Sequence, residues 1–329
     1  MEIRAPGDVT IAILSDIHHA GAIEHARGED YEFCRIANPL LRYVARAYRH
    51  LIWLRHPLDQ GRQLDRFLAE IGPVDYVVAN GDYSCDTAFV GVSDPGSCQS
   101  AQECLGKLRG KFGDRVRFTF GDHELGKLSL FGGNGGMQLA SWHCATRQLG
   151  LEPFWKLPIG RYLLLGVASP LIALPANQAD MPPSEWPEWQ SLREAHLAEI
   201  RAVFEALQPE QRVILFCHDP TALPFLWQEE SVRRRLSQVE QTVIGHLHTR
   251  LILWKSRVLS GIPPLRFLGR SVNRFTSALH QSHHWWPFQV RLCPALSGTE
   301  LLNDGGYYTL KIDPTANRPA SFTFHPLPR

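Results

Sequence analysis

Short apolar runs of strand length recur along this chain, and polar or glycine-containing clusters follow most of them. The runs are rich in Val, Ile and Leu and are bounded by turn-forming residues, which is the pattern of buried β-strands. They span Val9–Leu14, Tyr76–Ala79, Val116–Phe120, Tyr162–Ala168, Val213–Phe216 and Thr242–Ile244. We therefore expect a sheet-containing fold whose strands are separated by other elements.

Between these runs, apolar residues recur at helical spacing. One apolar stripe consists of Leu41, Val44, Tyr48, Leu51 and Ile52. Another face of the same predicted helix carries Arg42, Arg46 and Arg49. A second stripe consists of Trp189, His196, Ile200, Val203, Phe204 and Leu207. Alternating strands and helices predict an α/β layered architecture in which helices cover the strands.

The end of the chain has a different pattern. Tyr307–Ile312 and Ser321–Phe324 are joined by the turn-rich stretch DPTANRPA, so we predict a hairpin that closes a sheet. Because we find no internal repeat and no convincing linker, we predict a single domain over residues 1–329. It would carry a helical insertion near residues 35–71 and an irregular insertion near residues 256–300, before the hairpin.

The amino-acid composition limits the classes of protein that fit this sequence. Hydrophobic residues make up 44% of the 329 residues, enough for a sizeable core, and the formal net charge is +1. This balance argues against a long nucleic acid as partner, because such a protein needs a broad basic surface. Mean hydropathy is −0.18, and no apolar stretch reaches the ~20 residues of a membrane span. The N-terminus lacks the features of a signal peptide.

The cysteines and histidines add two expectations. The 7 cysteines include no Cys-x-x-Cys pair and are odd in number, which favours reduced thiols and a cytoplasmic location over a disulfide framework. The 15 histidines matter more, because histidine is the commonest metal ligand and the usual acid–base group near neutral pH.

Many acidic and histidine side chains fall in the clusters that follow the predicted strands. In chain order these are Asp16-Ile-His18, Gly81-Asp82, Gly121-Asp122-His123-Glu124, His218 and Gly245-His246-Leu-His248. The carboxyl ends of strands in an open α/β sheet converge on a ligand site. Imidazole nitrogens combined with carboxylate oxygens suit zinc, manganese or iron better than calcium. The sequence thus predicts a metal centre at one sheet edge.

These clusters resemble the motifs of the calcineurin-like metallophosphoesterases. That family carries D-x-H, G-D, G-N-H-[DE], a lone H and G-H-x-H in the same order, here spanning Asp16 to His248. The resemblance implies a four-layer α/β/β/α sandwich of two mixed sheets flanked by helices. It also implies a dinuclear metal-dependent phosphoesterase, in which a metal-activated hydroxide attacks a phosphomonoester or phosphodiester.

The resemblance also implies a role for each residue. The first metal would be held by Asp16, His18 and His248, and Asp82 would bridge the two metals. The second metal would be held by Asp122, His218 and His246. His123 would be the catalytic residue beside the scissile phosphate, aiding the leaving group. The cofactors would be two divalent or mixed-valence ions, with manganese, iron or zinc favoured and magnesium possible.

One position departs from the family's pattern. Asp122 stands where the family usually has asparagine, which is a neutral ligand. With two divalent ions and three carboxylates, the net charge around the metals would be +1 instead of +2. Such a site would attract anionic phosphate less and hold its metals more firmly.

Several alternatives remain open at this level. A catalytically weak or inactive member of the fold could act as a binding scaffold, and a lipid-linked pyrophosphate at a membrane surface could be the substrate in place of a small phosphorylated molecule. The arginine-bearing helix would ordinarily bury its apolar side and solvate its arginines, but it could instead contact an anionic membrane. The row Arg266, Arg270 and Arg274 and the cluster His280–Trp286 have no assigned role, and the oligomeric state is left open.

Overall fold

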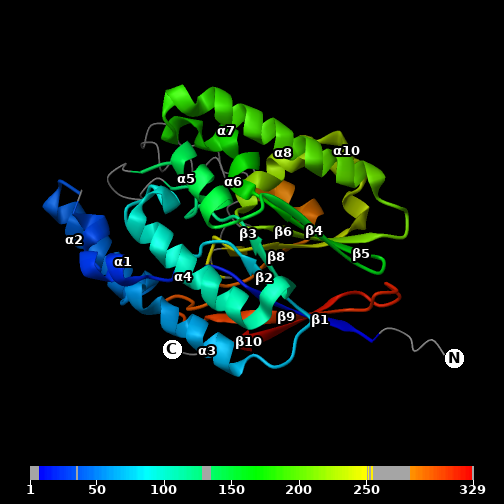
Figure 1. The fold of residues 1–329 in the computed structure, drawn as a ribbon, viewed down its shortest axis with the longest axis horizontal. Helices are drawn as coiled ribbons and strands as arrows, with labels where there is room; N and C mark the ends of the chain where they lie inside the picture. The colour runs from blue at the N-terminus through cyan, green and yellow to red at the C-terminus, as the bar shows by residue number, and fades with distance from the viewer. Residues whose placement is uncertain are drawn as a thin grey trace.

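Two five-stranded sheets pack face to face, with helices on both outer faces (Figure 1). The computed structural model describes residues 7–34, 36–127, 135–249, 251, 253–254 and 282–327. The first sheet has the order β10-β9-β1-β2-β3, and β1, β2 and β3 are parallel. Its strands are β1 Val9–Leu14, β2 Tyr76–Asn80, β3 Val116–Thr119, β9 Gly306–Ile312 and β10 Ser321–Pro326.

The second sheet has the order β4-β5-β6-β7-β8 and is parallel from β5 to β8, with β4 antiparallel at its edge. Its strands are β4 Phe154–Ile159, β5 Tyr162–Val167, β6 Arg212–Cys217, β7 Val239–Ile244 and β8 Val290–Leu292. Both sheets are mixed, as the resemblance implied, and the predicted fold class is confirmed.

Helices cover the outer face of each sheet. Those nearer the first sheet are α1 Ala22–Arg27, α3 Gly61–Glu70 and α4 Pro95–Phe112, followed in the chain by α5 Leu139–His143. Those nearer the second sheet are α6 Ser169–Ile172, α7 Leu174–Asn177, α8 Trp186–Ala206, α9 Leu223–Gln228 and α10 Glu230–Arg234. Helix α2, Pro39–Tyr48, projects from the body of the molecule (Figure 1).

The strand sequences explain this layering. Along β1, Ile11 and Ile13 pack between the two sheets, whereas Ala12 and Leu14 pack under the helices. Strand β6 has the same arrangement, with Ile214 between the sheets. A strand that is buried on both faces needs apolar residues at every position, because its successive side chains point to opposite faces. This is why these strands appear in the sequence as continuous apolar runs.

All six predicted strands are present, with ends that differ by a few residues, and the C-terminal hairpin is β9–β10. Strands β4 and β8 were not predicted. Strand β4 alternates buried and partly exposed positions and contains Pro158, which is compatible with its place at the sheet edge. Strand β8 has three residues and lies in the segment expected to be irregular. A strand this short leaves almost no periodicity to detect.

The insertions predicted from the sequence are only partly visible. Residues 255–281 lie outside the described residues, and so do Arg266, Arg270, Arg274 and His280. The remainder of the His–Trp cluster forms a 3-10 helix, Ser282–Phe288, which packs against α9 through His284 and Trp227 at 5.8 Å between ring centroids.

The first helical stripe is arranged differently from the ordinary expectation. Helix α2 begins at the predicted place, where the Asn38 side chain accepts hydrogen bonds from the backbone N–H groups of Leu40 and Leu41. However, its apolar side chains point outward, and Leu40 is 71% exposed. The expectation of a buried apolar face was wrong for this helix. Within the described residues, no helix is long and apolar enough to cross a bilayer.

Candidate metal centre

Five loops meet at the carboxyl-terminal edge of the two sheets. They follow strands β1, β2, β3, β6 and β7, and each carries residues that the sequence analysis selected. The backbone fixes neighbouring loops to each other: the N–H of Asp16 donates to the carbonyl of Gly81, and the N–H of His18 donates to the carbonyl of Asp82. The backbone N–H of His246 donates to the Asp16 carboxylate, which brings residues more than two hundred positions apart in the chain into contact.

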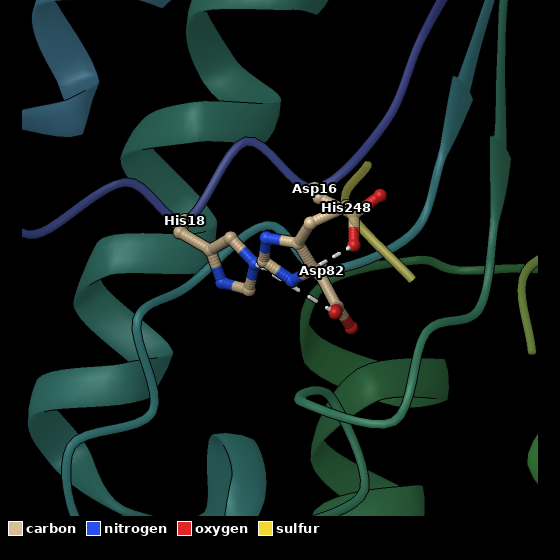
Figure 2. Close-up of side chains that lie close together, drawn as sticks. All are labelled: Asp16, His18, Asp82 and His248. Carbon is tan, nitrogen blue, oxygen red and sulfur yellow. Dashed lines mark hydrogen bonds and ion pairs between the residues drawn. The ribbon is translucent and has the colours of Figure 1, made fainter. Parts of the chain in front are cut away.

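The first cluster consists of Asp16, His18, Asp82 and His248, whose ligand atoms all lie within 4.8 Å of one another (Figure 2). His248 Nε2 lies 3.3 Å from both Asp16 Oδ1 and His18 Nε2. His18 Nε2 lies 3.9 Å from Asp82 Oδ2. All four side chains are buried. This set of two imidazoles and two carboxylates is a suitable ligand set for a transition metal.

The second cluster consists of Asp82, Asp122, His218 and His246, again within 4.8 Å of one another. His218 Nε2 lies 3.1 Å from Asp82 Oδ2 and 3.6 Å from Asp122 Oδ1. His246 Nδ1 lies 2.9 Å from the same Asp122 oxygen. Asp82 belongs to both clusters, so one carboxylate is positioned to bridge two cations. The structure thus brings all seven predicted ligands together.

Backbone conformation aims several of these side chains. Five of the seven residues have positive φ: Asp16, His18, Asp82, His246 and His248, at 50°, 47°, 57°, 59° and 56°. Non-glycine residues adopt this region rarely, and each costs of order ~1–3 kcal/mol unless the surroundings impose it. Because this backbone strain is concentrated on the clustered residues, it indicates that the loop conformations serve the site at a cost to the stability of the loops.

Two glycines allow the loops to approach closely. A Cβ at Gly245 would lie 2.1 Å from Ser15 Oγ and 2.6 Å from Asp16 Oδ2. A Cβ at Gly121 would lie 2.1 Å from Asp82 Oδ1. Any side chain at either position would collide with the atoms that place a ligand, so the chemistry of the site requires glycine there.

Backbone carbonyls orient the imidazoles. The carbonyl of Asn80 accepts from His218 Nδ1, which leaves Nε2 facing the carboxylates, and the carbonyl of Ser84 lies 3.4 Å from His18 Nδ1. The same arrangement orients histidine ligands in metal sites. His218 Nε2 and Asp82 Oδ2 are fully buried and have no hydrogen-bond partner. Two buried polar atoms that lie 3.1 Å apart and make no hydrogen bond fit a bound cation.

The pKa values of residues in the two clusters also fit bound cations. Burial raises the pKa of Asp16 to about 6, which shows how costly an uncompensated carboxylate is here. Burial alone would lower the pKa of His246, but the carboxylates of Asp122 and Asp219 outweigh it and raise this pKa to about 9. Burial lowers the pKa of His248 to about 3, which keeps it neutral and able to coordinate. Two buried carboxylates, Asp16 and Asp82, and the half-buried Asp122 in one site are balanced best by cations.

Glu124 has a structural role that the sequence analysis did not assign. Its fully buried carboxylate accepts hydrogen bonds from the N–H groups of Gly121, Asp82 and Tyr83, at 2.8, 3.1 and 2.8 Å. It therefore ties the loop after β3 to the loop after β2, next to the bridging carboxylate. Burial, followed by the charge of Asp82, raises the pKa of Glu124 to about 8. In the sequence, its place as the fourth residue of the Gly-Asp-His-Glu motif was the feature that could have indicated a role for Glu124.

His123, the predicted catalytic residue, borders both clusters without joining either. Its Nδ1 lies 3.0 Å from the carbonyl of Cys85, and its Nε2 lies 3.9 Å from Asp82 Oδ2 and contacts the Lys127 ammonium. Burial, and then the charge of Lys127, lower the pKa of His123 to about 4. From the sequence no catalytic role was predicted for Lys127.

Three further acidic or histidine side chains near the clusters have structural partners. Asp219 caps the turn after β6 by accepting from the N–H of Thr221, although its charge also acts on His246. Asp86 accepts from the N–H of Gly91 and from the Ser97 hydroxyl. His19 is buried and lies 3.1 Å from a Glu103 oxygen.

Comparison with known proteins agrees with this geometry. The family model described as calcineurin-like phosphoesterase matches residues 9–250, which is most of the chain and includes all seven clustered residues. The chain belongs to this family, whose members use divalent metals to hydrolyse phosphoesters.

Other comparisons add little. A solved structure from Streptococcus pneumoniae TIGR4, described as a conserved uncharacterized protein and predicted phosphoesterase, aligns over 98% of this chain and 100% of that chain. The identity is 12% and the TM-score 0.28, a likeness too weak to carry an argument. None of the curated proteins matches this chain.

Proposed function

We propose that this protein hydrolyses phosphomonoesters or phosphodiesters at a dinuclear metal site. The observation that carries the proposal is the shared carboxylate: Asp82 completes one cluster with Asp16, His18 and His248, and a second with Asp122, His218 and His246. Two cations bridged by one carboxylate are typical of enzymes that displace a group at phosphorus. Manganese, iron or zinc suits these ligands better than magnesium.

When bound, the cations supply Lewis acidity and an activated water as the nucleophile. The protein's own residues hold the parts of the site in position. Asp82 holds the two positions together, and its Oδ1 accepts from the His123 N–H at 3.1 Å, which fixes the loop after β3 relative to it. Glu124 and the carbonyl of Asn80 keep the surrounding loops and rings in place.

His123 and Lys127 act on the leaving group. His123 Nδ1–H donates to the carbonyl of Cys85, so its Nε2 is left to accept a hydrogen bond from the Lys127 ammonium, and the ammonium held in this way supplies the proton for the departing oxygen. The P–O ester bond breaks as this proton is delivered, and the nucleophile's oxygen remains on phosphorus. General acid catalysis of this kind contributes ~10²–10⁴-fold to the rate.

The test is turnover of 4-nitrophenyl phosphate and bis(4-nitrophenyl) phosphate by protein supplied with manganese, iron or zinc. We expect metal-dependent hydrolysis of at least one of the two, and the preferred one separates monoesterase from diesterase activity. Asp82→Asn should abolish it. Asp75→Asn is the matched control, because this exposed residue adjoins the opposite end of the same strand, where it accepts from the Thr10 N–H, and its substitution should leave turnover unchanged.

Protein that binds two metals and turns over neither compound would contradict the proposal and favour a binding scaffold. Equal activity of Asp82→Asn and wild type would contradict the assigned bridging role.

A further inference from the structure

The outer face of α2 and the π-helical segment that follows it, Arg49–Trp53, exposes large apolar side chains. Leu40 and Tyr43 are each 71% exposed, and Leu51 is 65% exposed. We call this surface the apolar ridge, formed by Leu40, Leu41, Tyr43, Val44, Leu51 and Ile52. Contiguous exposed apolar surface on a helix of a folded protein marks a site of interaction.

The arginines of the same helix hold it in this orientation. Arg49 is buried, pairs with Glu32 at 2.7 Å and donates to the carbonyl of Glu29. Arg46 pairs with Asp30 at 2.8 Å. Arg42 donates to the carbonyl of Ile36, at 3.1 Å through Nε. These contacts hold the arginine-bearing face of α2 against residues 29–36, so its apolar face points outward.

The apolar ridge is continuous with the candidate metal centre. Trp53 packs on the ligand His248 with 4.6 Å between ring centroids, and Tyr48 stacks on Trp53 at 6.4 Å. The next segment of surface is also apolar: the Leu301 N–H donates to the carbonyl of Ile52, and Leu301 is 60% exposed. Whatever covers the apolar ridge therefore lies beside the place where the phosphoester is cleaved.

The chemistry of this segment favours a lipid surface over a protein partner. Residues 39–53 contain three arginines, one histidine and no acidic residue. Arg55, next to the ridge in the chain, is 58% exposed and pairs with Glu300 at 3.9 Å. Because Arg46 and Arg49 are paired with Asp30 and Glu32, the attraction of this segment to a bilayer comes from its apolar face and not from a surplus of positive charge. A protein bound here would in addition cover the surface next to the substrate site.

We propose that the apolar ridge inserts into a lipid bilayer and that the substrate is a phosphorylated, acyl-bearing lipid. Its phosphoester reaches the metal centre past Trp53 while its acyl chains remain against the ridge. This inference rests on the proposed function and specifies its substrate class. Hydrolysis adds one water across the P–O bond, with the proton delivered to the departing oxygen as above.

The first test is co-sedimentation with vesicles of phosphatidylcholine containing a minority of phosphatidylglycerol. Wild-type protein should bind, and the variant Leu40→Ser/Tyr43→Ser/Leu51→Ser should bind at least about tenfold more weakly, because three exposed apolar contacts are lost. Trp286→Ser is the control: it removes a 58% exposed tryptophan from the helix Ser282–Phe288, against α9, and should bind as wild type does.

The second test compares inhibitors of aryl phosphoester turnover in solution, below the concentration at which lipids aggregate. Dihexanoyl phosphatidic acid should inhibit wild type at least about tenfold more tightly than glycerol phosphate does, and the triple variant should lose this advantage. Turnover of the aryl compound itself should be equal in all three proteins. Loss of turnover would count against the proposed function, separately from the lipid inference.

Absence of vesicle binding by wild type, or equal inhibition by the two phosphates, would overturn the inference. So would a dimer in solution that the triple variant dissociates, since the apolar ridge would then be an interface between two copies of this chain.

Discussion

Asp122 is the one residue of the metal centre at which this chain departs from its family's usual motif. Its Oδ1 lies within reach of both His218 and His246, at 3.6 and 2.9 Å. Burial raises its pKa, but the nearby imidazoles, led by His246, outweigh this and hold the pKa well below the usual value. The residue is therefore ionised, and it adds a full negative charge where the family has a neutral amide.

Asp122→Asn should keep activity and lower the pH optimum. Removing one negative charge leaves a more positive site, which acidifies bound water and attracts phosphate more strongly. The measurement is the pH profile of aryl phosphoester turnover, accompanied by metal content per chain. Complete loss of both metals and turnover would show that the carboxylate is indispensable and that the charge argument is wrong.

Residue identity and order carried most of the information about the site. Asp82 and its six companions could be selected because each follows a strand and because together they match one family's motifs. No role at the site could be assigned to Lys127 or Trp53 from the sequence, because a lysine in a loop and a tryptophan in a helical segment both have many ordinary roles. Only the fold places Trp53 on His248 and Lys127 on His123.

The loops between strands and ligands are the elements that set the geometry. Gly245→Ala should weaken metal binding by about tenfold or more, because the new methyl group would lie 2.1 Å from Ser15 Oγ and 2.8 Å from His218 Nδ1. Metal titration followed by calorimetry measures this. Gly106→Ala, at an exposed position of α4 with open space around it, should bind metal normally and be stabilised by ~1 kcal/mol. Equal metal affinity of the two variants would contradict the close-approach argument.

The packing of α8 on the second sheet contains a second titratable element, remote from the metal centre. His196 is buried, and its Nε2 accepts from the Ala168 N–H at 3.1 Å. Burial lowers its pKa from 6.5 to about 3. Between these two values the unfolded chain binds a proton that the folded protein does not, so stability falls as the pH falls below 6.5.

His196→Gln should reduce this pH dependence, since the glutamine oxygen can accept the same hydrogen bond without titrating. The free energy of unfolding of wild type should fall by about 2 kcal/mol more than that of the variant between pH 7 and pH 5. Denaturant unfolding at the two pH values measures the difference. Identical losses would show that His196 is protonated in the folded protein or does not titrate in this range.

At the scale of the whole molecule, the layered fold followed from the apolar runs, because strands buried on both faces have a distinctive composition. The edge strand β4 and the three-residue β8 could not be predicted from the apolar runs, because an edge strand is stabilised by its neighbour and a very short strand by tertiary contacts. The direction of the α2 face could not be read from periodicity, which gives an apolar face but not what it faces. It was fixed by the partners of Arg42, Arg46 and Arg49.

The direct measurement of the central claim is the number and position of bound metals. Elemental analysis of protein equilibrated with manganese should give two ions per chain in wild type, and anomalous diffraction should place them on either side of Asp82. One ion should lie among Asp16, His18 and His248 and the other among Asp122, His218 and His246. No bound metal, or metal held by other residues, would contradict the account.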